Sequence, residues 1–235
     1  MACGLGLETR EDWISWARSS KPTAETSRSL VTLPPTLRRR VTAVGQMAFR
    51  AACELSVPER ARFIFCSRHG EFRRTLSILA ALTNGEALSP AEFSLSVHNA
   101  LAGLLSIAWR NTAGHTTIAA GADSFGSALV EAASLLMERP DEPVLLVYFD
   151  EQLPEPYDEI ADNDETCVAI AMLLTSPRPD PGDTETSDVI VELAPATVAP
   201  RSASGEALAF LRFLLADDRK EKPGGEQLGG RWRRA

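Results

Sequence analysis

The stretch of residues 93–136 constrains the fold of this chain more than any other part of the sequence. Residues 116–119 are rich in β-branched side chains and predict a short strand, and the small residues 120–122 predict a tight turn. Asp123 or Ser124 is well placed to cap a following helix, along which apolar side chains recur at three- and four-residue spacing. Such a turn exposes one side chain beside free helix amides that stabilise negative charge. We therefore expect the functional site at this turn.

Composition and charge exclude several classes of protein. The chain has 235 residues, of which 44% are hydrophobic and 24% charged, which is typical of a soluble globular protein. Its net charge of −8 argues against nucleic acid as the main partner, because backbone recognition needs a basic surface. No apolar run is long enough to span a membrane, and the N-terminus lacks the pattern of a secretory signal. We therefore expect a cytoplasmic protein.

Apolar strands alternate with helices along the chain, which predicts a layered α/β domain. Because only a short loop separates the last two strands, we expect a mixed sheet rather than an all-parallel one. We expect residues 1–216 to form a single domain and the Gly- and charge-rich residues 217–235 to form a disordered tail. A long helix is expected at residues 36–55, and strands at residues 2–7, 62–66, 116–119, 143–149, 168–174 and 189–193.

Cys66 and Ser124 are the candidate nucleophiles. Cys66 occurs with His69, or with His98 and Asn99, which are the residue types of a Cys-His-Asn protease. It ends an apolar strand, however, and this position favours a buried structural thiol. The turn around Ser124 lacks the G-x-S-x-G pattern of serine hydrolases, so a residue of the first helical turn is the simpler interpretation. The four cysteines lack CxxC spacing and predict neither a disulfide framework nor a zinc site.

Three consecutive arginines, Arg38, Arg39 and Arg40, are expected in the first turn of the helix at residues 36–55. Positive charge there opposes the helix dipole, so the arginines form either a solvated patch or a contact with acids on a partner. The acidic loop at residues 155–165 lacks the spacing of a calcium-binding loop, and we expect no metal.

Four motifs occur in a fixed order along the chain. They are residues 37–40 (LRRR), residues 67–71 (SRHGE), residues 89–90 (SP) leading into residues 93–100 (FSLSVHNA), and residues 122–124 (ADS) followed by Glu131-Ala132. Together, over roughly residues 3–193, they resemble the short β-ketoacyl synthase-like family of aryl polyene (xanthomonadin-type) pigment clusters. Matching the turn backwards from Glu131-Ala132 places Ala122 where the acylated cysteine of a ketosynthase would be.

This resemblance implies a thiolase-like half fold, with a mixed five-stranded sheet and helices on both faces. It also implies a chain-length factor, the non-catalytic partner of a full-length ketosynthase in type II fatty-acid or polyketide synthesis, without cofactor or independent activity. An alanine cannot carry a thioester, and no histidine follows His115, so the Cys-His-His set of condensing enzymes is absent.

The resemblance further implies a heterodimer that also contacts an acyl carrier protein, for which Arg38, Arg39 and Arg40 are candidates. Phe125 is a core residue by its helical periodicity, and in a chain-length factor it would also limit the length of the acyl chain. Residues that line the acyl tunnel or the dimer interface would be His98, Asn99, Gly121, Ala122 and Phe125. For His98 and Asn99 the alternative is a buried pair whose polar atoms are satisfied locally. Residues 93–108 and 116–119 would contribute to the dimer contact. Two alternatives remain open: a stand-alone acyl-thioester hydrolase or acyltransferase that uses Ser124 or Cys66, and a self-associating scaffold.

Overall fold

A central sheet organises the structure, a computed structural model that describes residues 2–5, 7, 9–19, 34–160, 166–176, 189–193, 203–215, 222–223 and 230–234. Its strands, in the order β1-β5-β4-β2-β3, are β1 (Ala2–Gly4), β5 (Val168–Leu174), β4 (Val144–Asp150), β2 (Arg62–Cys66) and β3 (His115–Ile118). β2 is parallel to both β3 and β4, whereas β5 is antiparallel to β4 and β1 is antiparallel to β5. The expected α/β class and mixed sheet are confirmed.

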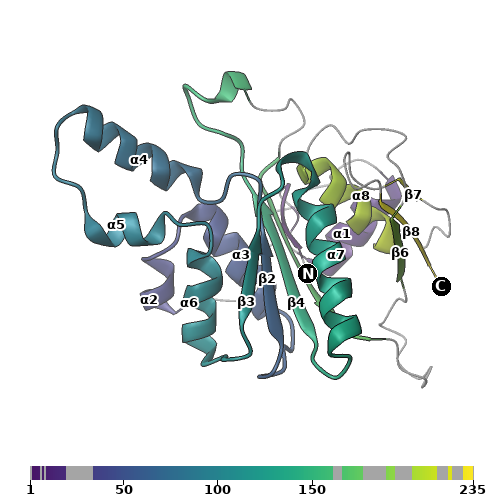
Figure 1. Ribbon diagram of the computed structural model, residues 1–235. Coiled ribbons are helices and arrows are strands. Elements are labelled where there is room, and N and C mark those ends of the chain that lie inside the picture. The colour runs from purple at the N-terminus through teal and green to yellow at the C-terminus, as the bar shows by residue number, and fades with distance from the viewer. Residues whose placement is uncertain are drawn as a thin grey trace.

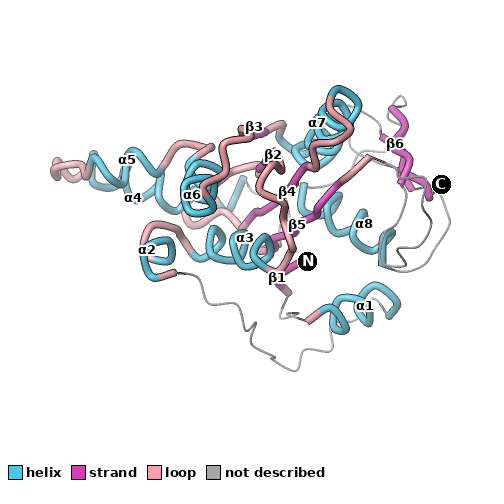
Figure 2. Tube along the Cα trace, turned by 90° about the horizontal axis from the view of Figure 1, so that it is seen from below, coloured by secondary structure: helices cyan, strands magenta, loops and turns pink. Residues whose placement is uncertain are grey.

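Helices cover both faces of this sheet (Figure 1). Viewed along the strands, α3 and α6 lie on one side of the sheet and α7 and α8 on the other (Figure 2). α1 packs with α7 and α8 in the same core. The bounds of these helices are α1 (Arg10–Ser19), α3 (Ala43–Cys53), α6 (Ala100–Trp109), α7 (Ser124–Glu138) and α8 (Ala203–Leu215).

The strands supply apolar side chains to two cores, because successive residues of a strand point to opposite faces. On β2, Phe63 and Phe65 join the core beneath α3 and α6, while Ile64 and Cys66 join the core beneath α7 and α8. β4 is buried along its whole length, as its uninterrupted apolar run predicts for a strand covered on both faces.

The helix expected at residues 36–55 is broken into α2 (Pro35–Arg38) and α3. Thr42 interrupts it, because its amide and its hydroxyl donate hydrogen bonds to Glu71 Oε1, at 2.6 and 2.7 Å. Arg38 therefore ends a short helix, and Arg39 and Arg40 follow it. The prediction of positive charge at a helix start was wrong, because Arg38 lies at the end of α2. Positive charge is favourable at that end of a helix.

β6 (Val189–Leu193) was expected in the central sheet but lies in a second, three-stranded sheet of order β6-β8-β7. It pairs antiparallel with β8 (Gly230–Arg234), which also pairs with β7 (Lys222–Pro223). The mixed character of the central sheet therefore comes from β5 and β1. Of the tail expected to be disordered at residues 217–235, the structure describes only β7 and β8; the rest lies outside the described residues.

An arm formed by α4 (Phe72–Thr83) and α5 (Pro90–Leu95) projects from the body of the molecule (Figure 1). The buried Arg74 guanidinium anchors its base. Arg74 forms an ion pair with Glu92 on α5, and its Nη2 donates to the carbonyl oxygen of Arg40 at 2.7 Å. The arm is thereby fixed to the chain beside α2.

Candidate functional site

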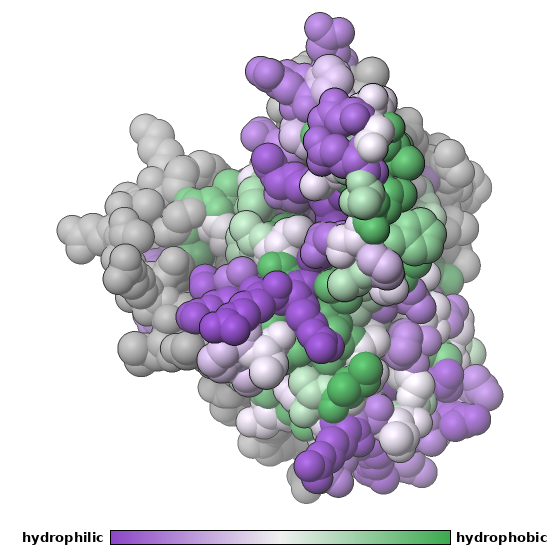
Figure 3. All heavy atoms as spheres, turned by 90° about the vertical axis from the view of Figure 1, so that its left-hand side faces the viewer, coloured by the Kyte–Doolittle hydropathy of each residue, from purple (hydrophilic) through white to green (hydrophobic). Residues whose placement is uncertain are grey.

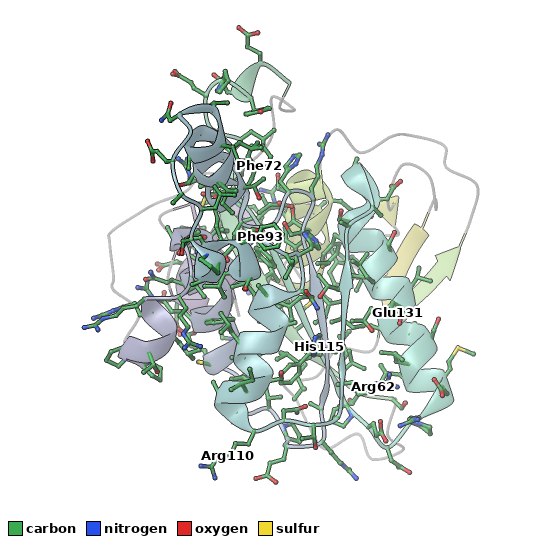
Figure 4. The ribbon with its side chains drawn as sticks, turned by 60° about the vertical axis from the view of Figure 1, so that its left-hand side comes forward. Arg62, Phe72, Phe93, Arg110, His115 and Glu131 are labelled. Atoms are coloured by element: carbon green, nitrogen blue, oxygen red, sulfur yellow. The ribbon has the colours of Figure 1, made fainter. Side chains whose placement is uncertain are left out.

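The parallel strands β2, β3 and β4 have their carboxyl ends at the same end of the sheet, where ligand sites of α/β folds form. Figure 4 shows Arg62 and His115, the first residues of β2 and β3, toward one end of the strands, and Phe72, beyond the loop after β2, toward the other. The predicted turn at residues 120–122 follows β3 at this second end. The candidate site therefore consists of this turn and the chain segments beside it.

Asp150, the last residue of β4, holds the loop after β2 in place. Its buried carboxylate accepts hydrogen bonds from Ser67 Oγ at 2.9 Å and from the amide of Arg68 at 2.9 Å. It also accepts from the amide of His69 at 3.3 Å and from the Tyr148 hydroxyl at 2.8 Å. The Asp150 carboxylate thus holds the loop after β2 against the end of β4, beside the turn.

The turn after β3 presents small side chains to solvent. Ala119, Ala120 and Gly121 are exposed, and Ala122 is half-buried. Gly121 has φ +61°, a left-handed conformation that favours glycine. The atoms that the turn offers to a neighbouring molecule are therefore methyl groups and backbone groups, none of them a nucleophile.

The Ser124 side chain stabilises the turn through hydrogen bonds to its backbone. Its hydroxyl accepts a hydrogen bond from the amide of Ala120 at 3.0 Å and donates to the carbonyl oxygen of Gly121 at 2.8 Å. The side chain is fully buried. Ser124 is thus a structural residue of the turn, and this geometry does not favour a serine hydrolase.

Cys66 is also fully buried. Burial raises the pKa of its thiol well above the ordinary value, and the nearby charges of Asp150 and Glu206 raise it further. A thiol in this environment stays protonated at neutral pH and is a poor nucleophile. The structure therefore favours the buried structural cysteine over the protease-like interpretation.

His98 lies beside the turn, at the junction of α5 and α6. Its Nε2 is 3.3 Å from the carbonyl oxygen of Ile118, the last residue of β3. Its ring also faces Gly70, where a side-chain Cβ would lie 2.9 Å from His98 Nδ1. The neighbouring Asn99 is exposed. His98 therefore connects the loop after β2 to the end of β3.

The Phe125 side chain does not reach the end of the sheet that bears the turn. It is fully buried in the core beneath α7 and α8, where its ring lies 5.7 Å from that of Tyr148 and 5.3 Å from that of Phe210. The expectation that Phe125 limits an acyl chain conflicts with this packing, since its apolar periodicity along α7 directs the ring into the protein's own core.

Arg38, Arg39 and Arg40 are exposed on α2 and the turn after it. Among the described residues, no ion pair involves them. The same described part contains no group of acidic, histidine and cysteine side chains that could hold a metal. Of the acidic loop, Glu155 and Asp158 are exposed, and residues 161–165 lie outside the described residues. No helix in the described ranges has the length and hydrophobicity needed to cross a bilayer.

Large apolar side chains are exposed on the arm and on α6. Phe93 of α5 is 62% exposed and Ile107 of α6 is 74% exposed. Figure 3 views the face that bears the arm and shows hydrophobic residues lying between polar ones. β3 forms the edge of the central sheet on this side. Phe93 and Ile107 both lie within residues 93–108, the segment that the resemblance implied for a dimer contact.

Comparisons with solved structures support the fold. The structure is similar to a chain of a ketosynthase (ApeO) in complex with its chain length factor (ApeC) from Xenorhabdus doucetiae, with TM-score 0.80 and 24% identity over 99% of this chain and 96% of that chain. It also resembles the ishigamide ketosynthase/chain length factor, with TM-score 0.60 and 14% identity over 82% of this chain and 65% of that chain.

A third similar structure is a type II polyketide ketosynthase bound to the hexaketide and in complex with its acyl-carrier protein (AntDE:AntF), with TM-score 0.54, 13% identity and coverage of 79% of this chain and 63% of that chain. This chain thus spans less than two thirds of the second and third matched chains. At these identities the likeness shows the shared fold. None of the curated proteins matches the sequence. The protein-family model for the β-ketoacyl synthase N-terminal domain matches residues 13–233, and the chain therefore belongs to this family.

Proposed function

We propose that this protein is a chain-length factor, the non-catalytic partner of a full-length ketosynthase, and that the pair acts in aryl polyene synthesis. The turn after β3 carries the proposal, because the position at which ketosynthases bear their acylated cysteine is Ala122, which is half-buried beside exposed Ala119, Ala120 and Gly121. Neither Ser124 nor Cys66 replaces that cysteine, since both side chains are fully buried.

Similarity to ketosynthase complexes supports the same assignment. The chain spans 96% of the matched chain in the complex of a ketosynthase with its chain length factor, and 65% and 63% of the two longer relatives.

The partner binds the face formed by the arm, α6 and the β3 edge. An edge strand offers unpaired backbone groups to another chain, and exposed apolar patches of this kind mark protein interfaces. Phe93 and Ile107 are the most exposed large apolar residues of that face. The turn and His98 lie at the end of β3, so the same contact brings Gly121, Ala122 and His98 to the acyl tunnel of the partner.

Arg38, Arg39 and Arg40 bind the acyl carrier protein or acids of the ketosynthase. Their exposure, and the absence of described acidic partners within the chain, support this role. Guanidinium groups pair well with carboxylates and phosphates, and a carrier protein presents its acyl chain on a phosphopantetheine.

The experiment compares two aspartate substitutions at similarly exposed residues. Ile107→Asp places a charge on the proposed interface, whereas Met137→Asp places one at the far end of α7, where Met137 is 85% exposed. Each variant is co-expressed with a tagged ketosynthase from the same genome, and the recovered complex is quantified. We expect I107D to lose most of the complex and M137D to retain it. Equal recovery of both variants would contradict the proposed interface.

A further inference from the structure

A buried carboxylate occupies the start of the helix that follows the turn. Glu206 of α8 is 3% exposed, and its Oε2 accepts a hydrogen bond from the amide of Gly126 at 3.1 Å. Gly126 is the third residue of α7. A side-chain Cβ at this position would lie 2.8 Å from Glu206 Oε1. The glycine therefore permits the carboxylate to approach the helix backbone directly.

This contact lies close to Ala122. Gly126 follows Ala122 by about one helical turn, and α8 packs against both α7 and the short 3-10 helix η1 (Gly121–Asp123) that contains Ala122. The amides at the start of α7 are the groups that favour negative charge. In this protein the buried carboxylate of Glu206 supplies that charge.

Other groups at this end of the sheet are also acidic. The side chain of Asp123, in η1, is buried, and so is that of Asp150 at the end of β4. The charges of Asp150 and Glu206 both raise the pKa of the Cys66 thiol. The negative charge of Glu206 therefore acts beyond its hydrogen bond, on the Cys66 thiol at the end of β2.

We propose that Glu206 fills the anion-binding position at the start of α7, so that a second residue besides Ala122 closes this turn to thiolate and acyl-thioester chemistry. The inference rests on the proposed function, because it treats the turn as the nucleophile position of a ketosynthase. Restoring a cysteine at residue 122 will therefore not restore a reactive thiolate while Glu206 is present.

The test compares A122C with A122C/E206Q, using iodoacetamide as the thiol probe over a range of pH. Digestion with a glutamate-specific protease isolates residues 93–131 as one peptide (residues 93–138 in E131Q). Neither peptide holds a native cysteine, so mass spectrometry reads Cys alkylation at residue 122 alone. We expect the E206Q background to lower the apparent thiol pKa by about one unit and to raise the alkylation rate at pH 7 about five- to tenfold. The matched control E131Q, on the same α7 helix (Figure 4), should change the rate less than about twofold, because charge effects at a helix start are confined to its first turn.

Equal thiol pKa values in the two backgrounds would overturn the proposal. Gln retains a carbonyl oxygen for the Gly126 amide, so E206Q keeps the cap while removing the charge, and a thermal melt verifies folding. If E206Q does not fold, A122C alone decides: we expect its thiol pKa at or above the ordinary value of about 8.5, and a value below about 7 would overturn the inference. The measurement needs no ketosynthase, so its failure is distinct from a failure to form the heterodimer.

Discussion

Replacing Asp150 by Asn should destabilise the protein by about 2–4 kcal/mol, because its carboxylate accepts hydrogen bonds from four buried or half-buried donors. The hydroxyls of Ser67 and Tyr148 can rotate to accept from the new amide nitrogen. The backbone amides of Arg68 and His69 cannot, and they approach different oxygens of Asp150 at their shortest distances, 2.9 and 3.3 Å. One amide therefore loses this acceptor and faces a donor, and an unsatisfied buried donor costs about 1–3 kcal/mol before the loss of the negative charge is added.

Urea unfolding followed by tryptophan fluorescence measures this change, with Asp141→Asn as the control. Asp141 is exposed in the turn before β4 and should tolerate the same substitution within about 0.5 kcal/mol. The denaturant dependence of the unfolding free energy should be unchanged in both variants, since neither alters the surface exposed on unfolding. If D150N were as stable as D141N, Asp150 would not hold the loop after β2 as we describe.

Two further substitutions test the surroundings of the site. Burial raises the pKa of the Glu71 carboxyl above its ordinary value of 4.5, despite the lowering effects of the Thr42 hydrogen bonds and of Arg74. The folded state thus binds this proton more tightly, and its contribution to stability falls as pH rises from 4.5 through the folded pKa; Glu71→Gln should flatten this decline in urea titrations across that pH range. Ser124→Ala should lower the unfolding free energy by about 1–3 kcal/mol and leave the condensing activity of the complex intact, whereas complete loss of activity in a folded variant would restore Ser124 as a nucleophile.

The parts of the fold that could be predicted from sequence are those that local patterns specify. The apolar run at residues 143–149 corresponds to β4, and residues 116–119, which are rich in β-branched side chains, correspond to β3 within one residue at either end. The turn and α7 follow where the small residues and the apolar periodicity place them. In each case the neighbours that determine the structure are within a few residues in the chain.

Features set by distant residues were missed. The helix at residues 36–55 breaks at Thr42 because of Glu71, 29 residues away, and β6 leaves the central sheet because it pairs with β8. Glu206 reaches Gly126 from 80 residues away. No local pattern distinguishes such a buried carboxylate from a solvated one. The turn could therefore be located from sequence, but the acids that surround it could not.

The central claim is that this chain forms a heterodimer with a ketosynthase and does not itself carry the acyl group. The most direct measurement is native and denaturing mass spectrometry of the protein co-expressed with the ketosynthase encoded nearest to it, after incubation with an acyl carrier protein loaded with an acyl thioester. The account predicts a one-to-one complex in which only the ketosynthase gains the acyl mass. A monomer that ignores the ketosynthase, or an acyl group on this chain, would contradict it.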